Sequence, residues 1–289
     1  MDFRFYKYHT RNTMVDYGKL RDAQLLELEL LKKFREICDA EGFRYYLLGG
    51  TAIGAIRHAG FIPWDDDIDV GLLREDYEQF LKVAPKYLCK EQRILHYTVD
   101  ENYADYTMKL VNIKVSYLTQ REETIVKQNI WIDIFPIDGT PNSRVARWLH
   151  FRKLDLIRLK LAFHYIKDVR IDKSRAIWKK ALVWFAKKTS IGKLIDPIRE
   201  KKNLDKEFRR YIVSRSNFIG NYMGAYHEKE FFPAEYFTEG YKVIFEGEEF
   251  LAPTALDKYL THQYGDYMKL PPENSRIPKH HIIDIIREN

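Results

Sequence analysis

Cysteine is scarce in this chain, and no hydrophobic run is long. Only Cys38 and Cys89 occur among 289 residues, far apart and without metal-ligand spacing, so a disulfide framework is not expected. No stretch approaches the roughly 18 uncharged apolar residues that a transmembrane helix needs, and the first ten residues lack the apolar core of a secretory signal. These absences predict a cytoplasmic protein that is neither exported nor membrane-spanning.

The charge is unevenly distributed along the chain. Lys and Arg outnumber Asp and Glu by 21 to 7 between residues 144 and 210, although the whole chain carries a formal charge of only +6. The remainder is therefore acidic. A basic segment joined to an acidic body suits nucleic acid, anionic lipid or a polyanionic substrate.

The hydrophobic pattern predicts an α/β fold. Residues 19–41 have apolar side chains at three- and four-residue intervals, as in an amphipathic helix, and we expect Leu25 on its inner side. Strands are expected at 43–51, 107–119 and 128–139, the last of them stopped by Pro136. A short helix capped by Thr51 should follow the first strand.

The second half of the chain has a different character. Residues from about 141 to 215 lose strand character and read as a basic helical insertion. A hairpin turning near Gly247, a helix at 254–265 and an irregular tail at 269–285 should follow. We expect one catalytic domain over residues 1–289, with a mixed sheet as its core.

A cluster of acids lies between apolar residues in the segment FIPWDDDIDVGL at 61–72. Because alternate residues of a strand share a face, Asp67 and Asp69 should point one way, while Ile68 and Val70 point into the core. Asp133 alternates with isoleucines in the same manner. Three carboxylates brought together repel one another unless a cation binds them, and Mg²⁺ or Mn²⁺ suits such oxygen ligands. The plainer alternative is a solvated acidic turn.

Gly49, Gly50 and Thr51 supply the second part of a phosphate site. Paired glycines allow a ligand to approach the backbone, and the amides at the start of a helix favour anions. A glycine turn followed by an acid pair and a third acidic strand resembles the signature of the nucleotidyltransferase superfamily.

Three blocks make the resemblance more specific. LLGGTAIGAIRHAGFIPWDDDIDVGL at 47–72, WIDIFPIDG at 131–139 and YGDYMKLPPENSRIPKHH at 264–281 resemble the LicD family. The resemblance implies transfer of phosphocholine from CDP-choline to sugar hydroxyls of surface glycans such as teichoic acids, with CMP released. Relatives in eukaryotes, fukutin and the fukutin-related protein, transfer ribitol phosphate. It also implies Asp67, Asp69 and Asp133 as metal ligands.

Other polar residues are candidates for the same site. Asp65 or Asp133 would help to deprotonate the acceptor hydroxyl, and Asp66 could orient a neighbour. Arg57 suits a pyrophosphate and His58 a proton transfer, although both also suit a helix C-terminus. Lys109 could neutralise phosphate charge, or be an ordinary exposed strand lysine.

The tail adds a basic cluster of Arg276, Lys279, His280 and His281. Adjacent histidines are usually surface residues, and the resemblance makes Arg276, His280 and His281 candidate donor contacts. We expect Mg²⁺ or Mn²⁺ as cofactor, a CDP-linked donor, and a glycan acceptor that is lipid-linked.

Three interpretations of the basic helices remain open. We expect peripheral membrane contact through residues 144–210 and no nucleic acid; a solvated helical face is the plain alternative. The rival functions are a nucleotidyltransferase that uses an NTP and a nucleic-acid-binding module built on these helices.

Overall fold

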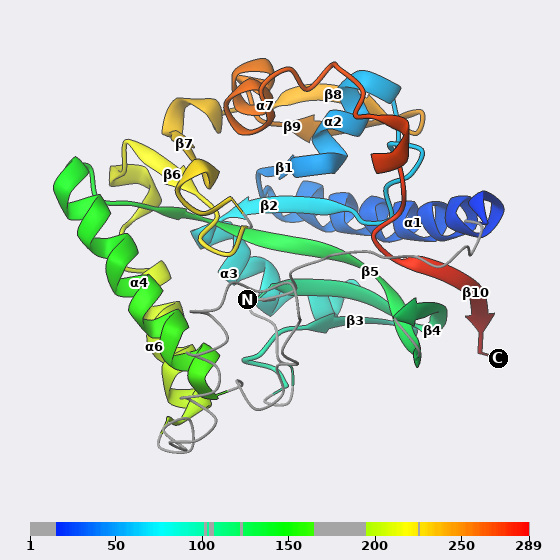
Figure 1. The fold of residues 1–289 in the computed structure, drawn as a ribbon, viewed down its shortest axis with the longest axis horizontal. Coiled ribbons are helices and arrows are strands. Elements are labelled where there is room, and N and C mark those ends of the chain that lie inside the picture. Colours follow the sequence, from blue (N-terminus) through cyan, green and yellow to red (C-terminus); the bar gives the residue numbers. More distant parts are fainter. Residues whose placement is uncertain are drawn as a thin grey trace. The chain divides into compact units, whose positions relative to one another are not determined.

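The computed structural model describes residues 16–100, 103, 107–121, 124–164, 195–224 and 226–288. The chain forms two compact units, one of Met1–Ile137 with Gly220–Asn289 and the other of Asp138–Ile219. The α-helices of the described residues are α1 (Tyr17–Glu41), α2 (Gly49–His58), α3 (Arg74–Val83), α4 (Arg144–His164), α6 (Pro197–Phe208) and α7 (Leu256–Tyr264) (Figure 1). The strands are β1 (Tyr45–Leu47), β2 (Asp69–Leu73), β3 (Gln92–Leu95), β4 (Met108–Arg121), β5 (Thr124–Gly139), β6 (Phe218–Gly220), β7 (Phe231–Pro233), β8 (Tyr241–Phe245), β9 (Glu248–Ala252) and β10 (His281–Arg287).

A mixed sheet forms the centre of the larger unit. Its strands follow the order β1-β2-β5-β4-β10, and β3 also pairs with β4. Strands β2 and β5 are parallel, whereas β1 with β2, β4 with β5 and β4 with β10 are antiparallel. The α/β fold with a mixed sheet is thereby confirmed. Helix α1 contacts β4 and β10, and the β8–β9 hairpin contacts β1 and α2.

Helix α1 has clear start and stop signals. The side chain of Asp16 accepts hydrogen bonds from the amides of Gly18 and Lys19, and Gly42 ends the helix with a φ of 73°, a conformation that glycine adopts easily. The helix predicted at 19–41 is confirmed and begins two residues earlier. Leu25 is exposed rather than buried, because the buried face is set by the row that contains Leu20 and Phe34.

Aromatic packing joins α1 to the sheet. The ring of Phe34 meets that of Tyr45 edge to face at 5.3 Å and that of Phe80 at 5.1 Å. All three side chains are buried. These contacts connect α1, β1 and α3, so the helix is fixed on the sheet beside the segment that carries the acids.

Three local predictions are wrong. Helix α2 starts at Gly49 with Leu48 as its N-cap, so Thr51 lies inside the first turn and does not cap it. Strand β5 continues past Pro136 to Gly139. The tail is not irregular throughout, because residues from His281 onward form β10 and pair with β4.

The smaller unit is helical in its described part. Helices α4 and α6 pack together, and the Lys153 ammonium lies 2.6 Å from the Glu207 carboxylate between them. This unit includes the predicted insertion at about 141–215, of which 165–194 lie outside the described residues. That the whole chain acts as one catalytic domain stays a prediction.

Candidate active site

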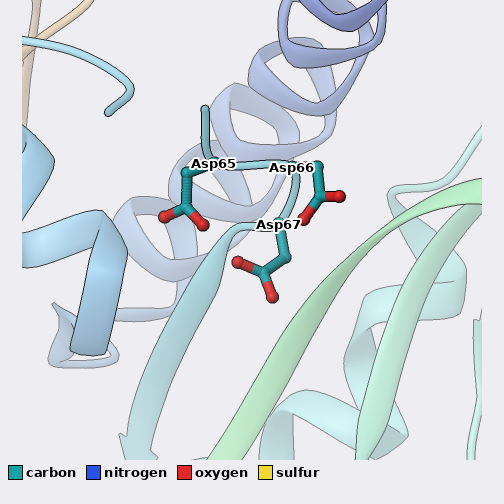
Figure 2. Close-up of side chains that lie close together, drawn as sticks. All are labelled: Asp65, Asp66 and Asp67. Carbon is teal, nitrogen blue, oxygen red and sulfur yellow. The ribbon is translucent and has the colours of Figure 1, made fainter. Parts of the chain in front are cut away.

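Three consecutive carboxylates gather on the loop that leads from α2 into β2. Asp65, Asp66 and Asp67 each offer an oxygen, and these oxygens lie within 4.8 Å of one another (Figure 2). Asp66 is buried, and its Oδ1 has no hydrogen-bond partner. The acid segment is therefore not a freely solvated turn.

Parallel pairing places the next two acids side by side. Asp69 on β2 is the register partner of Asp133 on β5, so both side chains lie on one face of the sheet. Their neighbours Ile68, Val70 and Ile134 are fully buried, as the alternation predicted. Asp133 accepts a hydrogen bond from the Trp131 indole at 2.8 Å and lies 3.7 Å from the Lys109 ammonium.

The glycine turn lies directly against these acids. A Cβ on Gly50 would approach Asp65 Oδ2 to 2.5 Å, and one on Gly49 would approach Asp69 Oδ2 to 3.2 Å. Gly49 also has a φ of 53°, so glycine is needed there for two reasons. The Gly49 amide donates to the Tyr259 hydroxyl at 3.0 Å, and the Thr51 hydroxyl accepts from the Asp69 amide at 2.9 Å. Thr51 thus ties the turn to β2.

The cluster is electrostatically unfavourable without a counter-ion. Burial raises the pKa of Asp65 well above its usual range, and the charge of Asp67 adds to the effect. Burial likewise raises the pKa of Asp69, with further contributions from Asp67 and Asp133. Like charges in a partly dry site repel strongly, and a bound cation relieves that repulsion.

The C-terminal segment brings basic groups to the acids. Lys279 Nζ lies 2.5 Å from Asp67 Oδ2. Burial opposes its charge, yet Asp67 and the neighbouring acids raise the pKa of Lys279 overall. The His280 amide donates to Asp66 Oδ2, and its imidazole Nδ1 lies 3.3 Å from the same oxygen.

The remaining candidates lie at the edge of the site or outside it. The Arg276 guanidinium stacks 5.7 Å from the Trp64 ring centroid and donates to the Pro271 carbonyl. His281 begins β10, opposite Gln120, and within the described residues no hydrogen bond or ion pair joins His281 to the acids.

Arg57 and His58 end α2 beside the acid loop. Arg57 donates to the Tyr267 carbonyl at 2.6 Å. Burial lowers its pKa, while the charge of Asp65 acts in the opposite direction. The His58 ring lies edge to face with Trp64 at 6.3 Å, and burial followed by the charge of Arg57 lowers its pKa.

Sequence reasoning missed two residues. Lys279 stands in the sequence only as part of a basic tail, and nothing local indicates a contact with Asp67. Glu27 on α1 is 2% exposed, and its Oε2 has no hydrogen-bond partner. Burial raises the pKa of Glu27, and the charges of Asp66 and Asp67 raise it further. The sequence does indicate that Glu27 is buried, because it falls on the apolar face of α1 between Leu20 and Leu31.

The residues fit a divalent cation. Several carboxylates converge beside a glycine turn, Asp66 Oδ1 lacks a partner, and burial followed by mutual repulsion raises the pKa values of Asp65 and Asp69. Asp67 belongs to the loop triplet, and its charge also acts on Asp69. Oxygen ligands of this kind favour Mg²⁺ or Mn²⁺.

A separate buried carboxyl gives the larger unit a pH-dependent stability. Burial raises the pKa of Glu230 from about 4.5 to about 7, although the Tyr226 amide and Gln263 donate to it. Below pH 4.5 the group is protonated in both folded and unfolded chains. As pH rises toward 7, only the unfolded chain ionises readily, so the free energy of unfolding falls by up to about 3 kcal/mol.

Glu230→Gln should remove this pH dependence of the free energy of unfolding. We compare the free energy of unfolding of the variant with that of wild type. We expect this difference to favour the variant by about 1–3 kcal/mol more at pH 8 than at pH 5. Urea unfolding of both proteins at the two pH values measures it. An equal difference at both pH values would contradict the assignment.

Known proteins match this chain in sequence. Residues 42–166 match the family model described as LicD/FKTN/FKRP, nucleotidyltransferase domain. The lipopolysaccharide cholinephosphotransferase LicD of Haemophilus influenzae is 34% identical over 268 residues, which cover 90% of this chain and 96% of that protein. Human ribitol 5-phosphate transferase FKRP is 50% identical over 40 residues, 14% of this chain and 8% of that protein. The chain therefore belongs to the LicD family.

Proposed function

We propose that this protein transfers a phospho-alcohol group, phosphocholine in the first instance, from a CDP-linked donor to a sugar hydroxyl of a cell-surface glycan. Family membership makes the chain a phosphotransferase. The observation that carries the proposal is the convergence of the loop acids on the glycine turn, with Asp69 beside Asp133. The acceptor we propose is a lipid-linked precursor of lipopolysaccharide or teichoic acid, reached at the cytoplasmic face of the membrane.

We assign different roles to the individual acids. We assign Asp67, Asp69 and Asp133 as ligands of Mg²⁺ or Mn²⁺, which when bound would neutralise charge on the phosphate oxygens. Asp65 lies against Gly50, and we assign it to accept the proton of the acceptor hydroxyl. The sugar oxygen forms a bond to the distal phosphorus of the donor, the bond between that phosphorus and the CMP oxygen breaks, and CMP leaves with the electron pair.

We assign the basic groups around the acids to binding of the donor. The ammonium of Lys279 lies beside Asp67, and that of Lys109 lies beside Asp133. Arg57 lies in the last turn of α2, and we assign it with Arg276 and His280 to the donor. His58 and His281 are the weaker assignments, because their described contacts are not with the acids.

A donor screen tests the function. The purified protein with Mg²⁺ is given CDP-choline, CDP-ethanolamine, CDP-glycerol or CDP-ribitol, and CMP is measured. We expect CMP from one donor above the others and none in excess chelator. Labelled CTP is the control: pyrophosphate from CTP, without CMP from any donor, would favour an NTP-dependent nucleotidyltransferase instead. A salt-dependent affinity for RNA that survives Asp67→Asn would favour the nucleic-acid module.

Helix α4 favours peripheral membrane contact. Among the described residues, no helix combines the length and apolarity that a bilayer span requires. Yet α4 is apolar on two sides: Phe151 and Leu154 are buried, and an opposite stripe is exposed. The large apolar side chains of that stripe are Val145, Trp148, Leu149, Leu156 and Leu159. A cationic helix with such a stripe suits an anionic lipid surface.

Vesicle binding tests this contact. Wild type should bind vesicles of phosphatidylglycerol more tightly than those of phosphatidylcholine. Trp148→Ser with Leu156→Ser should weaken binding at least about ten-fold, because two large apolar side chains are lost. The matched control is Ile125→Ser, which removes a 64% exposed side chain from β5. Equal binding by the double variant and wild type would contradict the contact.

A further inference from the structure

The loop that carries the acids is held from outside the site by the tip of the β8–β9 hairpin. Glu246, in the turn between these strands, donates its amide to the Ala59 carbonyl at 2.9 Å. Its Oε1 accepts the Phe61 amide at 3.0 Å. A Cβ on Gly60 would collide with the same carboxylate. The hairpin tip therefore fits against the backbone of residues 59–61 and fixes their path.

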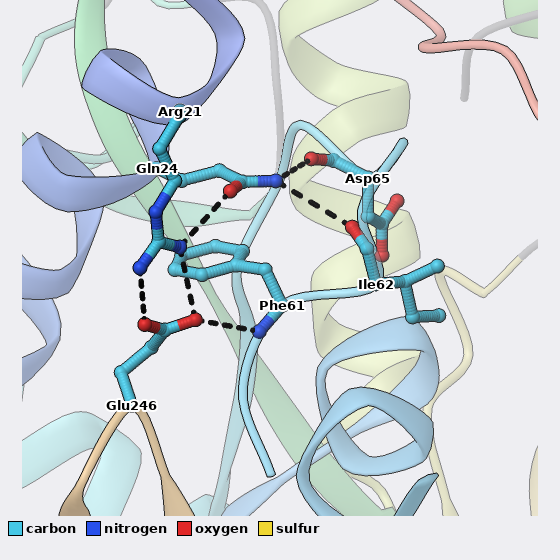
Figure 3. A network of polar contacts seen from close by, with 6 residues as sticks. All are labelled: Arg21, Gln24, Phe61, Ile62, Asp65 and Glu246. Carbon is cyan, nitrogen blue, oxygen red and sulfur yellow. Dashed lines mark hydrogen bonds and ion pairs between the residues drawn. The ribbon is translucent and has the colours of Figure 1, made fainter. Parts of the chain in front are cut away.

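Helix α1 completes the contact from the other side. Arg21 donates to both carboxylate oxygens of Glu246, at 3.0 and 2.5 Å, and to Gln24 Oε1 at 3.2 Å (Figure 3). Gln24 is 3% exposed and donates to the carbonyl of Asp65 at 2.8 Å and, more weakly, to that of Ile62 at 3.5 Å. A continuous polar chain thus runs from the hairpin tip to the first acid of the cluster.

We propose that Glu246, Arg21 and Gln24 are positioning residues for the reaction, holding the loop so that the carboxylates of Asp65 and Asp67 face the donor and its metal. The inference rests on the proposed function of the acid site. None of the three side chains has a described contact with the carboxylate groups of the cluster; they act on the loop backbone. The loop needs such support because its acids repel one another, and small displacements of reacting groups are costly in rate.

The same two elements supply a matched control. Arg35, further along α1, lies 2.7 Å from the Glu248 carboxylate and donates to the Glu249 carbonyl at 2.8 Å. This pair also joins α1 to the β8–β9 hairpin, but no described hydrogen bond connects it to residues 59–65. Loss of either pair removes one tether between helix and hairpin. Only loss of the Glu246 pair releases the acid loop.

The experiment compares Glu246→Gln with Glu248→Gln in the full chain. Mn²⁺ affinity is measured by electron paramagnetic resonance, and CMP release from the donor chosen by the screen is followed at varied Mg²⁺, alongside Tm. We expect both variants to lose a similar few degrees or less of Tm. Only Glu246→Gln should weaken Mn²⁺ binding and raise the half-activating Mg²⁺ concentration, each about ten-fold, with a lower kcat.

A charge-exchanged double variant separates positioning from tethering. Arg21→Glu with Glu246→Arg restores an ion pair between helix and hairpin, but an arginine cannot accept the Phe61 amide. We expect Tm to recover and metal affinity not to recover. Recovery of both, or equal metal affinity in Glu246→Gln and wild type, would overturn the inference while leaving the proposed function intact. Absence of Mn²⁺ binding and of CMP release in wild type would overturn both.

Discussion

Asp67→Asn should lower the rate of CMP release from the CDP-linked donor by about a hundred- to a thousand-fold. Asp67 belongs to the loop triplet, and after burial its charge contributes most to raising the pKa of Asp69. Its loss removes a ligand from the centre of the site, where charge develops on the transferred phosphate, and single groups of this kind contribute about 10²–10³ in rate. Steady-state CMP release at saturating Mg²⁺ measures the effect.

The same variant should not be less stable without metal. Asparagine relieves repulsion within the cluster, at the cost of the ion pair with Lys279, so we expect Tm to be unchanged or higher. Added Mg²⁺ should raise Tm of wild type but not of Asp67→Asn, since only a ligand that binds the folded state stabilises it. Asp284→Asn, at an exposed acid that pairs with Lys19, is the control. A variant at position 67 that retains full activity would refute the assignment.

Lys279→Gln should have the next largest effect, a fall in kcat/KM of about a hundred-fold. Its ammonium lies 2.5 Å from Asp67 and is placed to balance the charge of a diphosphate once a cation occupies the acids. A charge-assisted contact of this kind contributes about 1.5–3 kcal/mol, which corresponds to roughly ten- to a hundred-fold.

The kinetic constant on which the loss falls tells whether Lys279 contacts the donor or acts on the metal site. If Lys279 contacts the donor, KM for the donor should rise while the half-activating Mg²⁺ concentration changes less. Lys269→Gln, an exposed lysine of the same tail, is the control and should behave as wild type. Indistinguishable kinetics for the two variants would remove Lys279 from the site.

The part of the site that lies on strands could be predicted from the sequence. Alternation of Val70 with Asp69 fixes which side chain leaves the core, and the same argument applies to Asp133. Asp67, expected on the same strand, instead lies on the loop before β2. The comparison confirms the family, whereas the donor and acceptor classes that the resemblance implies stay proposals. Period-two patterns carry this information because one face of each strand is buried.

The parts that depend on distant contacts could not be predicted. Lys279 meets Asp67 across 212 positions of sequence, and no local pattern encodes that pairing. The prolines of the tail favoured an irregular segment, whereas β10 forms because β4 offers it an edge. Glu246 lies in the hairpin turn predicted near Gly247, and only the structure shows that its carboxylate reaches Arg21 and the Phe61 amide.

Paramagnetic relaxation of the donor phosphorus nuclei by Mn²⁺ is the most direct test of the central claim that the acids hold a cation against the diphosphate. With CDP-choline as probe, wild type should strongly enhance the relaxation of both ³¹P signals at low Mn²⁺, and Asp67→Asn should not. Equal enhancement in the two proteins, or none in wild type, would contradict the account.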